Sequence, residues 1–275
     1  MAGWAQRNRY RLAMLGMLPL LAGALGGCVT TPDSPQSARG ADSARAPGSA
    51  ERKAAIRTQL AVGYFEQGQY AVALGEIKLA LAAEPDNAEA LGLRGLIEQA
   101  LGHTAAADEN FRRARKLAPE NPDLANNYGS FLCESGRVAE ALPLFDAALA
   151  NRAYRSPASA ANNAGACALK IKDYASAERY LLQALQLTPD LPATNANLAR
   201  LYVEKRDVQR AHFFVTRLAD VAKMESLTAD VLWLGIKVQH QVGDTGKQAG
   251  WVTQLRSRYP GSAEYAAYQR GAFDE

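Results

Sequence analysis

The sequence has few of the residues and patterns from which enzymes build active sites. It contains three cysteines and three histidines in 275 residues, and no phosphate-binding glycine loop, nucleophile elbow or paired-carboxylate motif. His103, His212 and His240 lack the cysteine or carboxylate spacing of a metal site. Sustained alternation of valine, isoleucine and threonine is also missing, whereas alanine and leucine are abundant. We therefore expect an all-α binding protein with no catalytic residue, no metal and no cofactor.

The first 28 residues lack aspartate and glutamate and have the pattern of a secretory signal. Three arginines precede the apolar segment 12–21, and small residues then lead to Cys28. The apolar segment is too short to predict a membrane-spanning helix. Without these residues, 28 basic side chains face 28 acidic ones, so the rest of the chain has no net charge. No nucleic-acid partner is expected, because binding to phosphates depends on positive charge.

The sequence Leu25-Gly26-Gly27-Cys28 resembles the bacterial lipobox. This resemblance implies a signal peptide over residues 1–27 and lipid on Cys28, and several acyl chains hold a protein stably in a bilayer. Because Val29 follows, the aspartate associated with inner-membrane retention is absent. The expected location is therefore the periplasmic face of the outer membrane, with the lipid in the inner leaflet. The alternative is an ordinary secreted protein that has Cys28 near its cleavage site.

Residues 28–50 are rich in serine, proline, alanine and glycine. Such a segment cannot bury a core, so we expect a disordered tether. About 22 residues reach roughly 70 Å when fully extended. A folded body that starts at residue 51 can therefore stand away from the membrane surface.

From residue 51 to residue 275 the sequence repeats with a period of 34 residues. Small residues, large apolar residues and prolines recur in the order of the tetratricopeptide helix-turn-helix unit, and Pro85 and Pro119 are one period apart. Each helix pair leaves an apolar face that the next pair covers, so the units should stack into a superhelical solenoid. Gly68, Gly102 and Gly136 fall at the turns inside units. The expected units are 54–87, 88–121, 122–157, 158–191, 192–225 and 229–261.

Five asparagines lie on the face of the first helices that is expected to line the inner groove of this solenoid. Asparagine is a mediocre residue inside a helix, so its recurrence there needs a cause. A carboxamide donates and accepts hydrogen bonds, and a row of them can hold the backbone of an extended peptide. The alternative is that the amides bond one another and water and so organise the repeats. These residues are Asn126, Asn127, Asn162, Asn163 and Asn197.

The first two units place apolar residues on the same face: Val62, Phe65, Leu93 and Leu96. Apolar groups on a concave surface are candidates for docking an amphipathic or extended segment of a partner. Burial by a different register, or by the first helix, is the alternative explanation.

Cys133 and Cys167 remain once Cys28 is assigned to lipid, and they are one period apart on adjacent first helices. The periplasm is oxidising, so a disulfide is expected if the two Cα atoms approach within about 7 Å. It would fasten repeats three and four and stabilise the fold by about 3 kcal/mol. Two buried free thiols are the alternative.

The segments N-N-Y-G-S-F-L-C at 126–133 and N-N-A-G-A-C-A-L at 162–169, together with the lipobox and six repeats, resemble the PilF/PilW family of type IV pilus biogenesis lipoproteins. The resemblance implies a pilotin that binds secretin subunits and promotes their outer-membrane localisation and multimerisation, which supports pilus biogenesis and twitching motility. Ser130 and the last repeat depart from the pattern. An adaptor for outer-membrane protein assembly or peptidoglycan hydrolases, and an envelope enzyme on a helical scaffold, are the alternatives.

The cysteine assignment predicts the result of thiol labelling. Unreduced protein unfolded in denaturant should contain no reactive thiol from Cys133 or Cys167, and should gain two after reduction. Mass spectrometry of alkylated protein measures both numbers. Two labelled thiols without reductant would eliminate the disulfide.

Overall fold

The structure, a computed structural model, describes residues 48–274. Within this range every regular element is helical and no strand occurs, which confirms the predicted all-α fold. The elements are α1 (Ser49–Glu66), α2 (Tyr70–Ala83), α3 (Ala88–Ala100), α4 (Thr104–Leu117), α5 (Pro122–Glu134), α6 (Val138–Ala150), α7 (Pro157–Lys170), α8 (Tyr174–Leu187), α9 (Pro192–Glu204), α10 (Val208–Val221), the 3-10 helix η2 (Met224–Ser226), α11 (Ala229–Val242), α12 (Thr245–Arg258) and α13 (Ala263–Arg270).

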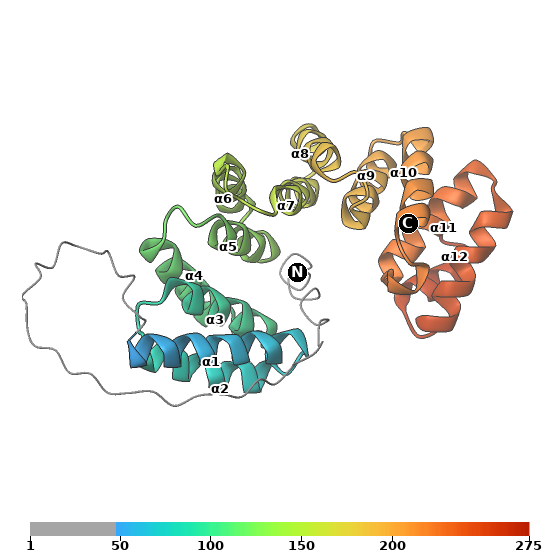
Figure 1. The fold of residues 1–275 in the computed structure, drawn as a ribbon. Coiled ribbons are helices and arrows are strands. Elements are labelled where there is room, and N and C mark those ends of the chain that lie inside the picture. Colours follow the sequence, from blue (N-terminus) through green and yellow to red (C-terminus); the bar gives the residue numbers. More distant parts are fainter. Residues whose placement is uncertain (1–47, 275) are drawn as a thin grey trace, which may run out of the picture.

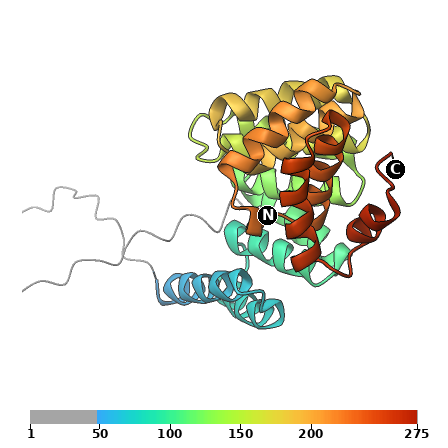
Figure 2. The same cartoon turned by 90° about the vertical axis from the view of Figure 1, so that its right-hand side faces the viewer.

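Helices α1 to α12 form six consecutive pairs. We call the first helix of each pair the A helix (α1, α3, α5, α7, α9 and α11) and the second the B helix (α2, α4, α6, α8, α10 and α12). The pairs follow one another along an arc, with α5 and α7 on its inner side and α6 and α8 on its outer side (Figure 1). The view turned by 90° shows that the arc also winds out of one plane (Figure 2). This arrangement confirms the predicted solenoid of six tetratricopeptide units.

Caps and prolines explain where the A helices begin. The side-chain oxygen of Asn87 accepts a hydrogen bond from the backbone N–H of Ala90 at 2.8 Å, which satisfies a donor in the first turn of α3. Pro122, Pro157 and Pro192 are the first residues of α5, α7 and α9. Proline is suited to this position because the first helical N–H has no partner within the helix.

The turn between an A helix and its B helix requires one residue with a left-handed backbone. Gly68, Gly102 and Gly136 supply it in the first three repeats, with φ values of 74°, 79° and 79°. Repeats four and five place Lys172 and Arg206 at the same point, with φ values of 59° and 57°. A side chain makes this conformation unfavourable, so these two turns carry a cost that the glycine turns avoid.

Small residues in the A helices allow close packing within each pair. A Cβ atom built on Gly165 would lie 2.5 Å from Cγ of Leu181, and one on Gly235 would lie 2.5 Å from the ring of Trp251. Gly235 therefore occupies in repeat six the position that Gly165 occupies in repeat four. This equivalence places the start of the sixth unit at residue 228, one residue before the predicted start at 229.

Successive repeats are joined by aromatic stacking and by a partly buried polar contact. The ring of Phe111 on α4 lies 5.6 Å from that of Tyr128 and 5.4 Å from that of Phe131, both on α5. The Tyr128 hydroxyl donates to Asp108 at 2.8 Å, and Arg137 donates to the same oxygen at 3.0 Å. Burial alone would raise the pKa of Asp108, but these hydrogen bonds outweigh it and hold the pKa below its ordinary value.

A tyrosine and a carboxylate also connect repeats four and five. The Tyr202 hydroxyl on α9 donates to Glu178 on α8 at 2.7 Å, and its ring stacks on that of Phe214. Burial, followed by the hydrogen bond to Glu178, raises the pKa of Tyr202 to about 12. The hydroxyl therefore remains a donor across the neutral range, which keeps the contact between repeats intact.

The turn between repeats three and four is longer than the equivalent turns. It spans residues 151–156, whereas the turns at 118–121 and 188–191 have four residues. Tyr154 in this turn is 8% exposed and packs with Ala125 and Ala160. The two residues that this turn has beyond the others therefore bring an aromatic ring into the core.

Aromatic residues close the C-terminal end of the described solenoid. Trp251 is buried beneath α11, and the Tyr259 hydroxyl donates to the backbone carbonyl of Leu227 at 3.0 Å. The ring of Trp233 lies 5.6 Å from that of Phe273, which follows α13. The end of the solenoid is thus covered by the last part of the chain.

The predicted signal peptide, the lipidated Cys28 and the tether as far as residue 47 lie outside the described residues. The predicted end of the tether at residue 50 is wrong, because α1 already begins at Ser49. The Glu51 carboxylate accepts the backbone N–H of Gly48 at 2.7 Å and so supports the first turn of the helix. Among residues 48–274, no helix is both long and apolar enough to cross a membrane.

The left-handed residues provide a test of the turn geometry. Replacing Lys172 or Arg206 with glycine should raise the free energy of unfolding by about 0.5–1 kcal/mol each, because glycine removes the steric cost at positive φ. Urea denaturation of each variant measures the change. Gly102→Ala is the matched control and should lower stability. A loss of stability in both glycine variants would contradict this account.

Candidate functional site

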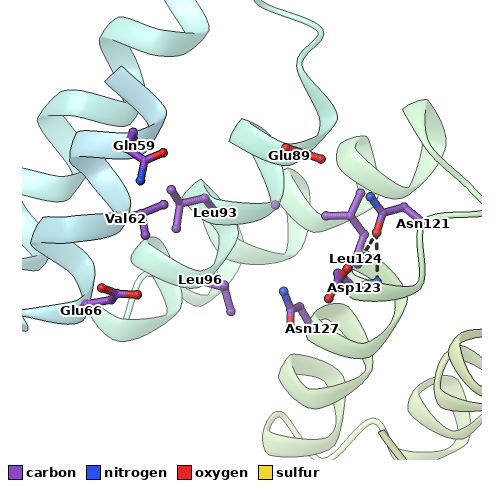
Figure 3. A pocket seen from close by; sticks show the side chains of 11 residues that line it. Gln59, Val62, Glu66, Glu89, Leu93, Leu96, Asn121, Asp123, Leu124 and Asn127 are labelled. Atoms are coloured by element: carbon purple, nitrogen blue, oxygen red, sulfur yellow. Dashed lines mark hydrogen bonds between the residues drawn. The ribbon is translucent and has the colours of Figure 1, made fainter. Parts of the chain in front are cut away.

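A groove of about 370 Å³ lies between the A helices of the first three repeats. Figure 3 shows side chains from α1, α3 and α5 converging on it. Its lining residues are Gln59, Val62, Glu66, Glu89, Gly92, Leu93, Leu96, Asn121, Asp123, Leu124 and Asn127.

The floor of the groove is apolar and is shared by all three helices. Val62 and Leu96 are half-buried, whereas Leu93 and Leu124 are 3% and 4% exposed. Gly92 makes room for this arrangement, because a Cβ atom there would lie 2.3 Å from Cδ2 of Leu124. The floor therefore exposes apolar surface, mainly from Val62 and Leu96, that packing between the repeats leaves only partly buried.

Carboxylates and amides surround this floor. Glu66 and Glu89 are exposed and make no ion pair within the described residues, and Asp123 lies beside Leu124 (Figure 3). Asn121 accepts hydrogen bonds from the backbone N–H groups of Asp123 and Leu124 at 3.0 and 3.1 Å, so its oxygen is used as the cap of α5. The groove thus combines apolar surface with a negatively charged rim.

Four of the residues predicted for the groove lie in it: Val62, Leu93, Leu96 and Asn127. Phe65 does not line it, so that prediction is wrong. Its ring packs instead against that of Tyr70, with 5.4 Å between centroids, because the end of α1 turns this side chain toward α2.

The acidic rim was not among the residues predicted for the groove. Glu66 follows Gln59 and Val62 by seven and four residues, so the three share one face of α1. The sequence spacing alone could therefore have placed Glu66 beside Gln59 and Val62. Glu89 and Asp123 come from the first turns of other helices, and only the stacking of repeats brings them to the same groove.

Two of the predicted groove asparagines are buried between repeats. Asn162 and Asn197 are 8% and 9% exposed, and the Asn197 amide donates to the Asn162 oxygen at 3.0 Å. The Thr194 hydroxyl donates to the same oxygen at 3.3 Å. The prediction that Asn162 and Asn197 are open groove residues is therefore wrong, because the Asn197 amide pairs with the Asn162 oxygen across α7 and α9.

The remaining asparagines form a second, partly exposed connection. Asn163 on α7 donates to the Asn126 oxygen at 3.0 Å and to the Ser130 hydroxyl at 3.3 Å. The Asn126 amide in turn donates to Asn127 at 3.4 Å. Of the five asparagines, Asn127 alone belongs to the residues that line the groove.

Cys133 and Cys167 connect the same pair of A helices on their buried side. The structure joins them as a disulfide between α5 and α7, with 5.7 Å between their Cα atoms. Lys170 donates to the backbone carbonyl of Cys133 at 3.3 Å. Repeats three and four are therefore linked by a covalent bond as well as by amides.

The part of the chain that the structure describes contains no group of three or more histidine, cysteine or acidic residues able to hold a metal. The groove has the geometry of a binding surface with apolar, amide and carboxylate groups. The fold and this groove define a tetratricopeptide repeat protein.

Comparison with protein families agrees with this class. Models of the tetratricopeptide repeat match residues 122–190 and 88–121, and a model of the Fis1 C-terminal tetratricopeptide repeat matches residues 59–103. A tetratricopeptide repeat protein from Parabacteroides merdae shares the fold, with a TM-score of 0.62 and 18% identity over 80% of this chain and 83% of that one.

More specific relatives come from one biological system. The type IV pilus assembly protein PilF of Pseudomonas aeruginosa is 30% identical over 252 residues, which cover 91% of this chain and 95% of the relative. The crystal structure of PilW, a type IV pilus biogenesis factor, is 33% identical with a TM-score of 0.70, over 78% of this chain and 98% of PilW. The Pseudomonas aeruginosa PilF structure is 27% identical with a TM-score of 0.70, over 82% of this chain and 100% of that one. The chain belongs to the PilF/PilW family.

The buried amides predict a structural role that can be separated from binding. Asn162→Ala should lower the free energy of unfolding by about 1–3 kcal/mol, because it leaves the Asn197 and Thr194 donors without their acceptor. Asn127→Ala should change it by no more than about 0.5 kcal/mol, since this residue lies at the open groove. Urea denaturation measures both, and equal effects of the two variants would argue against the distinction.

Proposed function

We propose that the protein is an outer-membrane lipoprotein pilotin of the type IV pilus system. In this proposal the groove between α1, α3 and α5 binds a segment of the secretin, and the protein promotes secretin localisation and multimerisation. Membership of the PilF/PilW family supports a role in pilus biogenesis. The observation that carries the binding step is the convergence of Val62, Leu93, Leu96 and Leu124 from three repeats on one groove.

The groove is suited to a polypeptide segment with apolar side chains. Its floor spans three consecutive A helices, so a bound segment contacts several repeats at once. Amphipathic or extended segments bind such surfaces through apolar anchors. Asn127 and Gln59 at the edge can hydrogen-bond the backbone of the segment, because each carboxamide donates and accepts.

Lipid on Cys28 supplies the second part of the mechanism. A lipid anchor confines the protein to the membrane surface, and a tether lets the folded domain search the space beside it. Confinement raises the effective concentration of the groove near membrane-associated secretin subunits without any additional contact. A Cys28→Ser variant would retain the groove and lose this confinement.

Groove substitutions test the binding step. Val62→Glu and Leu96→Glu should reduce heat-stable secretin multimers at least about tenfold and abolish twitching, because a buried unpaired carboxylate costs more than about 1.4 kcal/mol. Leu187→Glu is the matched control, since Leu187 is 47% exposed at the end of α8 and away from the groove. Immunoblots of unboiled cell extracts and thermal melts of each purified variant are measured together.

A deletion strain, assayed in the same way, distinguishes a pilotin from an adaptor for other envelope machinery. In that case, deletion would disturb other outer-membrane proteins or peptidoglycan hydrolysis and would leave secretin multimers unchanged. Folded groove variants that support normal multimerisation would overturn the proposed binding site. Normal multimerisation in a deletion strain would overturn the pilotin function itself.

A further inference from the structure

The N-terminal end of the solenoid exposes large apolar side chains. Ile56 and Leu60 on α1 are 63% and 41% exposed, and Val72 and Leu79 on α2 are 46% and 45% exposed. In both helices these residues share a face, because they are spaced by four and by seven positions. We call these four residues the N-terminal face. They lie on the first helix pair of the arc (Figure 1).

The equivalent position of Ile56 is buried in each of the next four repeats. Ala90, Leu124, Ala160 and Thr194 are 0%, 4%, 0% and 0% exposed. In those repeats the preceding helix pair packs against the A helix, as the stacking of Phe111 on Tyr128 and Phe131 illustrates between α4 and α5. Ile56 is exposed because repeat one has no preceding pair within the described residues.

Helix α2 differs from the B helices of repeats two and five on the side that faces the preceding repeat. Arg113 and Arg217, which occupy the position of Leu79 in repeats two and five, reach back to the preceding turn. They donate to the backbone carbonyls of Pro85 at 2.9 Å and Pro189 at 3.2 Å. Repeat one therefore presents an apolar residue where repeats two and five place a hydrogen-bonding group.

The opposite end of the solenoid is covered. The ring of Phe273 stacks on that of His240 with 3.8 Å between centroids, and Tyr265 and Tyr268 on α13 pack against the last core cluster. Terminal repeats usually need a polar outer face to remain soluble. Of the two ends of the described solenoid, the N-terminal end therefore leaves its apolar face exposed.

The segment between Cys28 and α1 has little with which to cover this face. Residues 29–47 contain no leucine, isoleucine, methionine or aromatic residue, and Val29 is their only large aliphatic residue. Burial of an apolar face requires apolar partners, since the stabilisation scales with apolar area removed from water. In the proposed lipoprotein, which starts at Cys28 after removal of residues 1–27, the cover therefore comes from another molecule.

Positive charge beside the N-terminal face favours an acidic partner over a second copy of this chain. Lys53 shares the face of Ile56 and Leu60, and Arg52 is its neighbour; both are exposed and have no ion pair in the described part of the chain. Arg57 differs, because Glu76 on α2 binds it at 2.7 Å. Symmetric pairing of two copies through this face would bring like charges together, whereas acidic groups would complement them.

We propose that the N-terminal face binds an amphipathic helix of a partner protein, with acidic residues flanking its apolar stripe, in the place that a preceding B helix would occupy. The internal junctions favour a helix, because a helix covers this face in the repeats that follow. This surface lies outside the groove residues and can act independently of them.

Photo-crosslinking in cells that make the lipidated full chain tests the proposal. The photoreactive residue p-benzoylphenylalanine replaces Ile56 in one strain and Phe213, which is 54% exposed on α10, in a control strain. Mass spectrometry of the crosslinked peptide identifies its origin. We expect position 56, but not position 213, to crosslink to a helical segment with apolar residues at i, i+3, i+4 and i+7 and flanking aspartate or glutamate.

Charge reversal completes the test. Arg52→Glu combined with Lys53→Glu should reduce this crosslink at least about fivefold, because it opposes acidic groups on the partner. Thermal melts must show that both crosslinking variants and the charge variant remain folded, which the exposure of these positions favours. The proposal would be overturned if position 56 gave no crosslink, or crosslinked only to lipid, to a second copy or to a non-helical segment. It would also be overturned if position 213 gave the same crosslink or if charge reversal had no effect.

Discussion

The fold depends on the burial of each helix pair against its neighbour. An A helix with glycine or alanine at the closest approach accepts a large side chain from its own B helix, as Gly165 accepts Leu181. The other side of the pair must then be covered by the next repeat, as Phe111 is covered by Tyr128. Stability in such a solenoid is approximately a sum of repeat and neighbour terms. The ends of the array are therefore where surface chemistry is least constrained by packing.

Polar contacts make this stacking specific. The buried pair of Asn162 and Asn197 and the Tyr202–Glu178 contact each join consecutive repeats through groups that would be costly to leave unpaired. The disulfide between Cys133 and Cys167 adds a covalent link between repeats three and four. Repeats three to five are therefore held by amides, a disulfide and a tyrosine, whereas the groove spans repeats one to three.

The two proposed binding surfaces follow from incomplete burial in different directions. Among residues 48–274, no further helix packs against the inner faces of the three A helices that form the groove, and no helix pair precedes the first pair at the N-terminal face. The groove carries an acidic rim with Glu66 and Glu89, whereas the N-terminal face carries Arg52 and Lys53. Their opposite charges indicate partners of different chemistry. A lipid anchor on Cys28 would present both surfaces at the same membrane.

The repeat period by itself determined the helix pairs, the glycine turns and the all-α fold, because these depend on local spacing and backbone preference. It could not decide which way Asn162 and Phe65 point. Both lie near the boundary between the inner face and the packed faces of an A helix, where neighbouring helices settle exposure. The tertiary structure placed Asn162 against Asn197 and gathered Glu89 and Asp123 beside Val62. Residues from different repeats become neighbours only when the pairs stack, and a period within one chain does not contain that geometry.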